Sequence, residues 1–331
     1  MICERIMQVL DHLNTLKEEV EQINLQEGLL QMPSNAFRNR TDSVDCDAAI
    51  GPPSCESEHL SIAQCIQEVL FRLLDLHQPH IQFRVATICL AMSPAPSTAM
   101  DMGRMLYQLS KDSSNDALFT ERGLIPAIIK NVRQVSQKGS ERGVQHDAAV
   151  LLVAVLKNAT LDRNNRLLVA EANGPLVLSY LLRSEAVQAA GSPGAKAALH
   201  NDAATTLAVQ AIGVVRNLAA SKELLPLLRD GDILKGLRGA LVLCGNDADV
   251  AFGVARVLCK LSLDPRTVMD TMAQPDLLRS FVRLASTYVD EPAINLRFTY
   301  AFGNLVSQSP DNATSFTMVR MIPHSSIVAP T

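Results

Sequence analysis

Residues 211–241 read AIGVVRNLAASKELLPLLRDGDILKGLRGAL, and this stretch decides the fold. Its apolar residues at positions i, i+3, i+4 and i+7 are Ala211, Val214, Val215 and Leu218. This spacing places all four on one face of a helix. A polar turn, a short apolar segment and the helix breaker Gly231 follow, and a second apolar helix begins behind the glycine. The stretch therefore predicts two long helices separated by a short one.

The same apolar quartet occurs five times along the chain. The copies begin at Met102, Leu152, Ala211, Val254 and Phe298, which are 50, 59, 43 and 44 residues apart. The breakers that follow the first four copies are Gly123, Gly174, Gly231 and Pro275. A three-helix unit of about 40–47 residues is the repeat of armadillo proteins, and the HEAT repeat of two helices is the nearest alternative. The short apolar segment after each turn favours three helices. The two long intervals contain insertions at 136–146 and 185–206, which we expect to be mobile loops.

The composition is typical of a helical protein with a sizeable core. Hydrophobic residues make up 47% of the 331 residues, aromatic residues only 4%, and tryptophan is absent. The formal net charge of −4 argues against binding nucleic acid through bulk charge. The longest apolar run, 148–156, is far shorter than the roughly 20 residues of a membrane-spanning helix. Seven scattered cysteines and a start without a secretory signal favour reduced thiols in the cytoplasm. We expect an all-α protein without nucleic-acid or membrane partners.

Periodicity and composition divide the chain into four regions. They are an N-terminal heptad helix at 1–30, a flexible linker at 31–58, a helical repeat domain at 59–316 and a C-terminal tail at 317–331. In the first region, the apolar residues within 2–23 alternate at spacings of four and three, as in a coiled coil. This helix either pairs with another helix or packs on its own domain, and the sequence leaves both open. In the repeat domain, one helix is predicted to begin after Pro79 and to end near Met92.

Five segments resemble the third helix and following turn of armadillo repeats. They are LYQLSKD, LKNATLD, VRNLAAS, LCKLSLD and FGNLVSQ. The resemblance implies a right-handed superhelical solenoid. The blocks RMLYQLSKDSSNDALFTERGLIPAII, VRNLAASKELLPLLRDGDILKGLRGAL, DVAFGVARVLCKLS and LRFTYAFGNLVSQSPDNATSF further resemble, in order and spacing, the family of armadillo repeat-containing protein two. Members of that family continue with more repeats after the equivalent of FGNLVSQ, so we expect a shortened C-terminus.

The resemblance also implies a function. The family of armadillo repeat-containing protein two is associated with assembly of cilia and flagella, as an intraflagellar-transport adaptor for radial spokes. It implies a non-enzymatic adaptor in the cytoplasm and cilium or flagellum. Its protein partners would be radial-spoke components and the intraflagellar-transport machinery. The alternative is a general protein-interaction subunit of nuclear or trafficking complexes.

The third helices of armadillo repeats line the concave side, where Asn and Trp residues four apart hold extended peptides in some members. The positions that match this pattern here predict a partner-binding groove formed by Arg104, Gln108, Asn158, Asn217, Arg256, Lys260, Tyr300 and Asn304. Because no tryptophan is present, import-signal binding of the importin-alpha kind is not expected. The cations among these residues suit an acidic or amphipathic partner segment. The alternative is an ordinary solvated helix face.

The sequence contains no pattern that predicts catalysis, a cofactor or a metal. It has no phosphate-binding loop, no dinucleotide fingerprint and no metalloprotease motif. Cys46, Cys55 and His59 fit no zinc spacing, and Pro79 interrupts the helix that would align His77 with His80. Acidic residues before helices are predicted to be N-caps, among them one of the pair Asp247 and Asp249, and Asp162. We expect no enzyme activity, no cofactor and no metal site.

Overall fold

The structure is a computed structural model that describes residues 70–74, 77–92, 94–137, 142–190, 196–244, 246–308, 311–312 and 314. Regular secondary structure in this part of the chain is helical, and no strand occurs in it. The predicted all-α class is therefore confirmed for the described residues. The predicted N-terminal helix at 1–30, linker at 31–58 and tail at 317–331 lie outside them.

The chain divides into two compact units, with the boundary between residues 92 and 93. In the first unit the structure describes residues 70–74, which are helical, and helix α3 (Pro79–Ala91). Proline suits the first helical position because a backbone N–H there would have no partner within the helix. Helix α3 buries Phe83 and Ile88 completely or nearly so. The predicted helix from Pro79 to about Met92 is confirmed.

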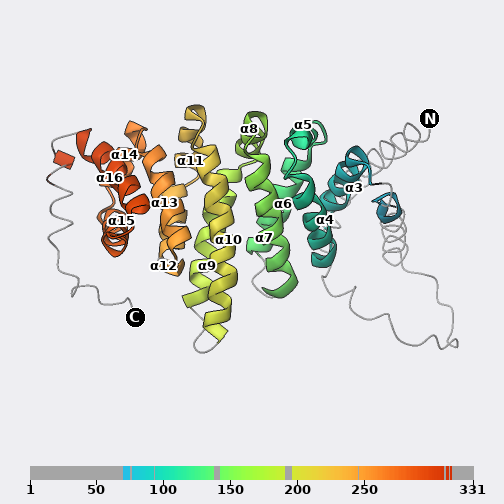
Figure 1. The fold of residues 1–331 in the computed structure, drawn as a ribbon, viewed down its shortest axis with the longest axis horizontal. Helices are drawn as coiled ribbons and strands as arrows, with labels where there is room; N and C mark the ends of the chain where they lie inside the picture. Colours follow the sequence, from blue (N-terminus) through green and yellow to red (C-terminus); the bar gives the residue numbers. More distant parts are fainter. Residues whose placement is uncertain are drawn as a thin grey trace, which may run out of the picture. The chain divides into compact units, whose positions relative to one another are not determined.

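The second unit contains the five long helices that carry the apolar quartets. They are α4 (Pro96–Leu109), α7 (Arg142–Ala159), α10 (Lys196–Leu218), α13 (Ala248–Leu261) and α16 (Pro292–Ser307). Every quartet side chain is buried or half-buried. The predicted apolar stripe is thus the face that each helix turns toward the core. The five helices pack on one another in chain order, α4 on α7, α7 on α10, α10 on α13 and α13 on α16 (Figure 1).

Two further series of helices lie between the long ones. The short series consists of α5 (Asp116–Glu121), α8 (Arg163–Glu171), α11 (Leu225–Asp230) and α14 (Pro265–Met272), with the 3-10 turns η1 (Ser113–Asn115) and η2 (Lys222–Leu224) before α5 and α11. The other series consists of α6 (Leu124–Gln137), α9 (Gly174–Ala190), α12 (Ile233–Cys244) and α15 (Pro275–Thr287). Helices α6, α9, α12 and α15 also pack in chain order. Each three-helix set therefore contacts the next through equivalent helices.

The predicted breakers separate the short helices from the helices of the α6 series, but for different physical reasons. Gly123 adopts the left-handed conformation with φ 63°. In the next two copies Asn173 and Asp232 take that conformation instead, with φ 59° and 56°. Gly231 is required by space, because a Cβ atom there would lie 2.7 Å from the Pro175 Cβ atom. Proline again occupies the first turn in the fourth copy, where Pro275 begins α15.

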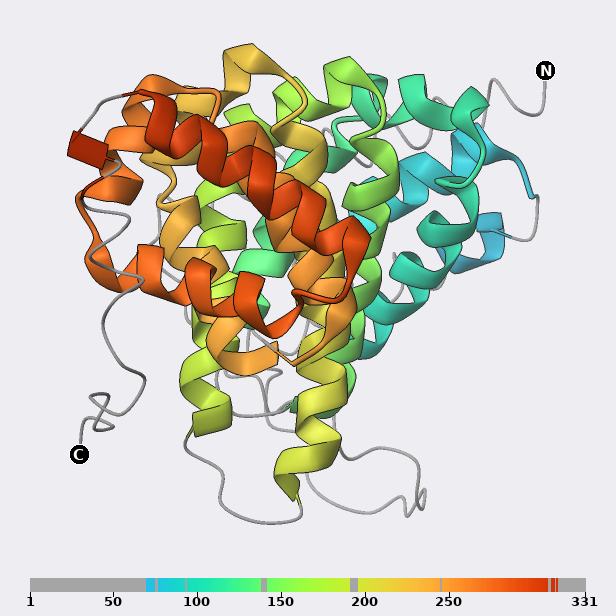
Figure 2. The ribbon, with the colours of Figure 1, turned by 60° about the vertical axis from the view of Figure 1, so that its left-hand side comes forward.

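The expectation of loops at both insertions was largely wrong. Helix α9 continues to residue 190 and α10 already begins at residue 196, so helix covers most of 185–206 (Figure 2). Helix α6 likewise extends to residue 137, and α7 begins at residue 142. In the insertion at 185–206 the physical reason is helix propensity, since AVQAA and AKAAL are rich in alanine, the strongest helix former.

Aspartates cap several helices, as predicted. The Asp247 carboxylate accepts a hydrogen bond from the Val250 N–H at 3.0 Å and begins α13. Asp162 accepts from the Asn165 N–H at 3.0 Å and begins α8. Each cap satisfies a backbone donor that has no partner within its helix and places negative charge at the positive end of the helix dipole. The capping role of Asp247 and Asp162 is therefore confirmed.

Candidate functional site

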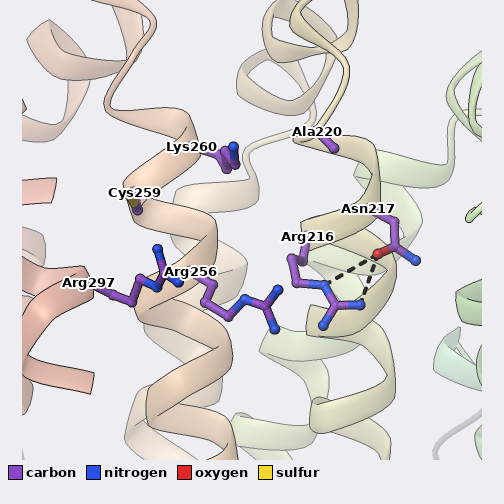
Figure 3. Close-up of a pocket in the computed structure, with 7 residues that line it drawn as sticks. All are labelled: Arg216, Asn217, Ala220, Arg256, Cys259, Lys260 and Arg297. Atoms are coloured by element: carbon purple, nitrogen blue, oxygen red, sulfur yellow. Dashed lines mark hydrogen bonds between the residues drawn. The ribbon is translucent and has the colours of Figure 1, made fainter. Parts of the chain in front are cut away.

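A pocket lies on the surface formed by three consecutive long helices, α10, α13 and α16. It has a volume of about 400 Å³. Its lining residues are Arg216, Asn217, Ala220, Arg256, Cys259, Lys260 and Arg297 (Figure 3). Four of these seven residues are cations at neutral pH, and none is an acid. We call this site the basic pocket.

The arginines of the basic pocket come from neighbouring helices and extend in one direction. The Arg297 side chain extends from α16 toward α13, and the Arg256 side chain extends from α13 toward α10 (Figure 3). The Arg256 guanidinium also lies over the Phe252 ring, 5.4 Å from its centroid. On α10, the Arg216 Nε and Nη2 atoms donate to the Asn217 Oδ1 atom at 3.3 and 3.0 Å. The contact with Phe252 and the hydrogen bonds to Asn217 restrict two of the three guanidinium groups, those of Arg256 and Arg216.

The cations of this surface lie close enough to repel one another. Burial and the neighbouring Arg256 lower the pKa of Arg216. Burial and Arg216 in turn lower the pKa of Lys157, which lies on α7, the next long helix. Within the described ranges, no carboxylate forms an ion pair with Lys157 or with a cation of the basic pocket. A bound anion would relieve this repulsion, so the arrangement favours an acidic ligand.

The basic pocket brings together three of the eight residues predicted for the groove, namely Asn217, Arg256 and Lys260. The other five lie on the same series of long helices but outside the pocket. Arg104 is 61% exposed and pairs with Asp101 at 3.4 Å, and Gln108 accepts a hydrogen bond from Lys111 at 2.9 Å. Tyr300 is 57% exposed on α16. The remaining two, Asn158 and Asn304, are half-buried.

The three predicted asparagines share a contact that the sequence did not indicate. The Asn158 Nδ2 atom donates to the Ser110 Oγ atom at 3.0 Å, and Asn304 Nδ2 donates to Ser262 Oγ at the same distance. Asn217 Nδ2 donates to the Thr160 Oγ1 atom at 3.1 Å and to the carbonyl of residue 157 at 2.8 Å. Each asparagine thus ties its long helix to the carboxyl end of the preceding one. Both amide hydrogens of Asn217 are used in this way, which leaves its oxygen for Arg216.

Arg216, Ala220, Cys259 and Arg297 line the basic pocket but were not among the predicted groove residues. Arg216 directly precedes Asn217, and Lys157 directly precedes Asn158, so the two cations occupy equivalent positions in consecutive copies. This recurrence is a signal that the sequence does contain. Arg297 lies seven residues before Asn304, about two helical turns away, and no repeated spacing marks it.

No group of three or more His, Cys, Asp or Glu side chains able to hold a metal ion is found in the part of the chain that the structure describes. Cys46, Cys55 and His59 lie outside that part. Cys89 in α3 is a buried thiol, and burial raises its pKa to about 12. Such a thiol is a poor nucleophile, because the thiolate is the reactive form.

None of the described helices has both the length and the apolar character needed to cross a bilayer. The exposed polar and charged side chains of the long helices, such as Arg104 and Gln108, agree with this finding.

The basic pocket gathers like charges from three helices of the second unit without a compensating acid among the described residues. No protein-family model matches the chain, and no curated protein is significantly similar to it.

Proposed function

We propose that this protein is a non-enzymatic adaptor that binds an acidic segment of a partner protein in the basic pocket. The observation that carries the proposal is the set of four cations, Arg216, Arg256, Lys260 and Arg297, around one cavity. A cluster of like charges without acidic partners destabilises the free protein slightly and gains favourable interactions when an anion binds. A purely solvated helix face, the alternative, gives no reason for the cations to converge.

The proposed architecture is an armadillo-type, right-handed superhelical solenoid. Three features support it: the recurring order of a short helix and two longer ones, the packing of each helix on its equivalent in the next copy, and the apolar stripe on every long helix. The short helices α5, α8, α11 and α14 favour the three-helix armadillo unit over the two-helix HEAT unit. The right-handed superhelix rests on the sequence resemblance.

The proposed binding surface continues beyond the basic pocket along the long helices. Lys157 on α7 extends the row of cations past Arg216, so the cations span four consecutive long helices, α7, α10, α13 and α16. Packed helices are about 8–10 Å apart, and an extended chain advances roughly 3.3 Å per residue. An extended segment of roughly ten residues would therefore contact the whole row. This length suits a peptide segment better than a small metabolite.

The proposed setting is the assembly of cilia and flagella, with radial-spoke components as cargo and the intraflagellar-transport machinery as carrier. This part of the proposal is supported only by the resemblance of the repeat segments. Co-precipitation of spoke components with the protein from cells that regenerate flagella is the expected result. Axonemal spokes that stay intact after loss of the protein would contradict it. Recovery of nuclear or trafficking subunits instead would favour the alternative, a general interaction subunit.

Charge reversal tests the binding surface directly. We expect the double variant Arg256→Glu with Lys260→Glu to weaken binding of a fluorescein-labelled polyglutamate peptide by about tenfold or more, because two attractive charges become repulsive. Lys235 and Arg238 are exposed on α12 and do not line the pocket, so the matching double reversal there is the control. Fluorescence anisotropy measures both affinities, and circular dichroism checks the fold. Equal affinity of the two double variants for the polyglutamate peptide would contradict the proposal.

A further inference from the structure

We infer that the basic pocket recognises a phosphorylated side chain within the acidic partner segment. The inference rests on the proposed function, because it specifies which anion the proposed surface is built to hold. A phosphorylated residue differs from Asp or Glu in charge and in shape. It carries about −1.5 to −2 charges at neutral pH and offers three acceptor oxygens.

The charge of the basic pocket favours a dianion over a carboxylate. Four cations surround one cavity, and no acid lines it. A single carboxylate would balance only one of them and leave most of the repulsion in place. A phosphate group balances up to two charges at one point. Further acidic residues of the segment would then face Lys157, which lies beyond Arg216 on α7.

The donor geometry also favours phosphate. The guanidinium groups of Arg256 and Arg297 have no hydrogen-bond acceptor among the described residues, and both belong to the pocket lining. Arginine presents a planar fork of N–H groups that matches two oxygens of a carboxylate or a phosphate, whereas lysine acts as a point charge. A phosphate group has three acceptor oxygens, so it can engage the forks of two arginines, while one carboxylate engages a single fork. The Arg256 guanidinium lies over the Phe252 ring, 5.4 Å from its centroid, and this contact restricts its position while using none of its N–H groups as hydrogen-bond donors to an oxygen.

Arg216 has a prepared orientation in the same cluster. Its Nε and Nη2 atoms donate to the Asn217 oxygen, and the amide of Asn217 is held by two hydrogen bonds to α7. Asn217 is buried, so this support is rigid. The guanidinium needs little reordering when a ligand binds, which lowers the entropic cost of binding.

Three peptides separate this inference from simple charge attraction. All are fluorescein-labelled and alternate glycine with glutamate. One has a central serine, the second has a phosphoserine there, and the third contains extra glutamates that match the net charge of the phosphopeptide. We expect the full-length protein to bind the phosphopeptide about tenfold more tightly than the charge-matched peptide, because the three oxygens of one phosphate can accept hydrogen bonds from more than one arginine, whereas each carboxylate pairs with a single arginine.

The variant Arg256→Lys tests the geometry while keeping the charge. We expect it to reduce the phosphopeptide preference from about tenfold to about twofold, since lysine lacks the planar fork. Arg283→Lys is the matched control, because Arg283 is exposed on α15 and does not line the pocket. The pH adds a second readout that does not depend on any variant. Binding of the phosphopeptide should weaken as the pH falls through about 6, the second pKa of phosphate, while binding of the charge-matched peptide stays constant there.

Equal affinity for the phosphopeptide and the charge-matched peptide would overturn the inference and leave the proposed function standing. Binding of none of the three peptides would overturn both. Tighter binding of a single-stranded oligonucleotide than of the phosphopeptide would also overturn the inference, because the surface would then serve a nucleic acid. A phosphopeptide preference that Arg256→Lys does not reduce would exclude the pocket as its source.

Discussion

The Asn304 side-chain amide donates a hydrogen bond to the Ser262 hydroxyl at 3.0 Å and thereby joins α16 to α13. The same arrangement joins α7 to α4 through Asn158 and Ser110. In both pairs the hydroxyl belongs to the residue that follows the last turn of the earlier long helix. Asn158 and Asn304 therefore each form a hydrogen bond between consecutive three-helix sets.

The contact of Asn217 is the most buried of this kind, so its loss should be costly. We expect Asn217→Ala to lower the free energy of unfolding by about 1–3 kcal/mol, because the Thr160 Oγ1 atom and the carbonyl of residue 157, at the carboxyl end of α7, each lose a hydrogen bond. Gln108→Ala is the control, since Gln108 is exposed and its hydrogen bond to Lys111 lies on the surface. Chemical denaturation measures both variants. Equal stability of the two variants would show that the amide ties contribute nothing.

Replacement by alanine at two glycines, Gly236 and Gly303, should change the stability of the protein in opposite directions. A Cβ atom at Gly236 in α12 would lie 2.8 Å from the Cα atom of Ser179 in α9, and backbone atoms cannot move aside easily. We expect Gly236→Ala to destabilise the protein by about 1–3 kcal/mol through overpacking. At Gly303 in α16 no atom lies within 4 Å of the added Cβ atom, so Gly303→Ala should stabilise the helix by about 0.5–1 kcal/mol. Thermal melts of both variants test the pair, and a shift in the same direction for both would contradict it.

Asp116 should make stability depend on pH in a direction opposite to most carboxylates. Burial raises its pKa above the ordinary 3.8, and the nearby Asp162 and Asp112 raise it further. Because the folded-state pKa is above the unfolded one, its contribution to stability is complete below the unfolded pKa and is lost as the pH rises through the folded pKa. Asp116→Asn should therefore stabilise the protein at neutral pH and have little effect near pH 3. Denaturation at both pH values tests this, and a loss of stability at neutral pH would refute it.

Cys89 should resist alkylation in the folded protein. Its thiol is 3% exposed, and burial raises its pKa to about 12, so almost no thiolate is present at neutral pH. We expect iodoacetamide to modify Cys89 only after denaturation, while the half-buried Cys259 reacts earlier. Peptide mapping by mass spectrometry follows each cysteine separately. Rapid labelling of Cys89 in the native protein would indicate that α3 opens readily.

Periodicity predicted the long helices because their apolar side chains must recur on the buried face. The quartet beginning at Ala211 lies on α10 and is fully buried, for example. The extension of α9 and α10 into the region of residues 185–206 was missed, because glycine and proline at 191–194 masked the helix propensity of the alanine-rich segments on either side. Glycine and proline predict where a helix is interrupted, but they do not predict how many residues separate it from the next helix.

The basic pocket was only partly predictable for a related reason. The resemblance to armadillo repeats identified Asn217, Arg256 and Lys260, because they occupy the positions of its four-residue Asn/Trp pattern on the predicted third helices. Arg297 reaches the same pocket from a different register position on α16. Which side of each helix faces the pocket depends on how the helix is rotated against its neighbours. That rotation is set by packing details such as the contact of Gly253 with Ile212, which no repeat pattern encodes.

The packing of each long helix on its equivalents in adjacent sets has a consequence for unfolding. In such an arrangement the free energy of unfolding is approximately the sum of each three-helix set's own stability and the interactions between neighbouring sets. A substitution that weakens one interface therefore destabilises mainly the two sets that share it. A destabilising substitution between α10 and α13 would leave α4 and α7 packed on each other. Hydrogen exchange would then show different protection for the helices on the two sides of the weakened interface. We therefore expect one end of the second unit to unfold while its opposite end remains folded.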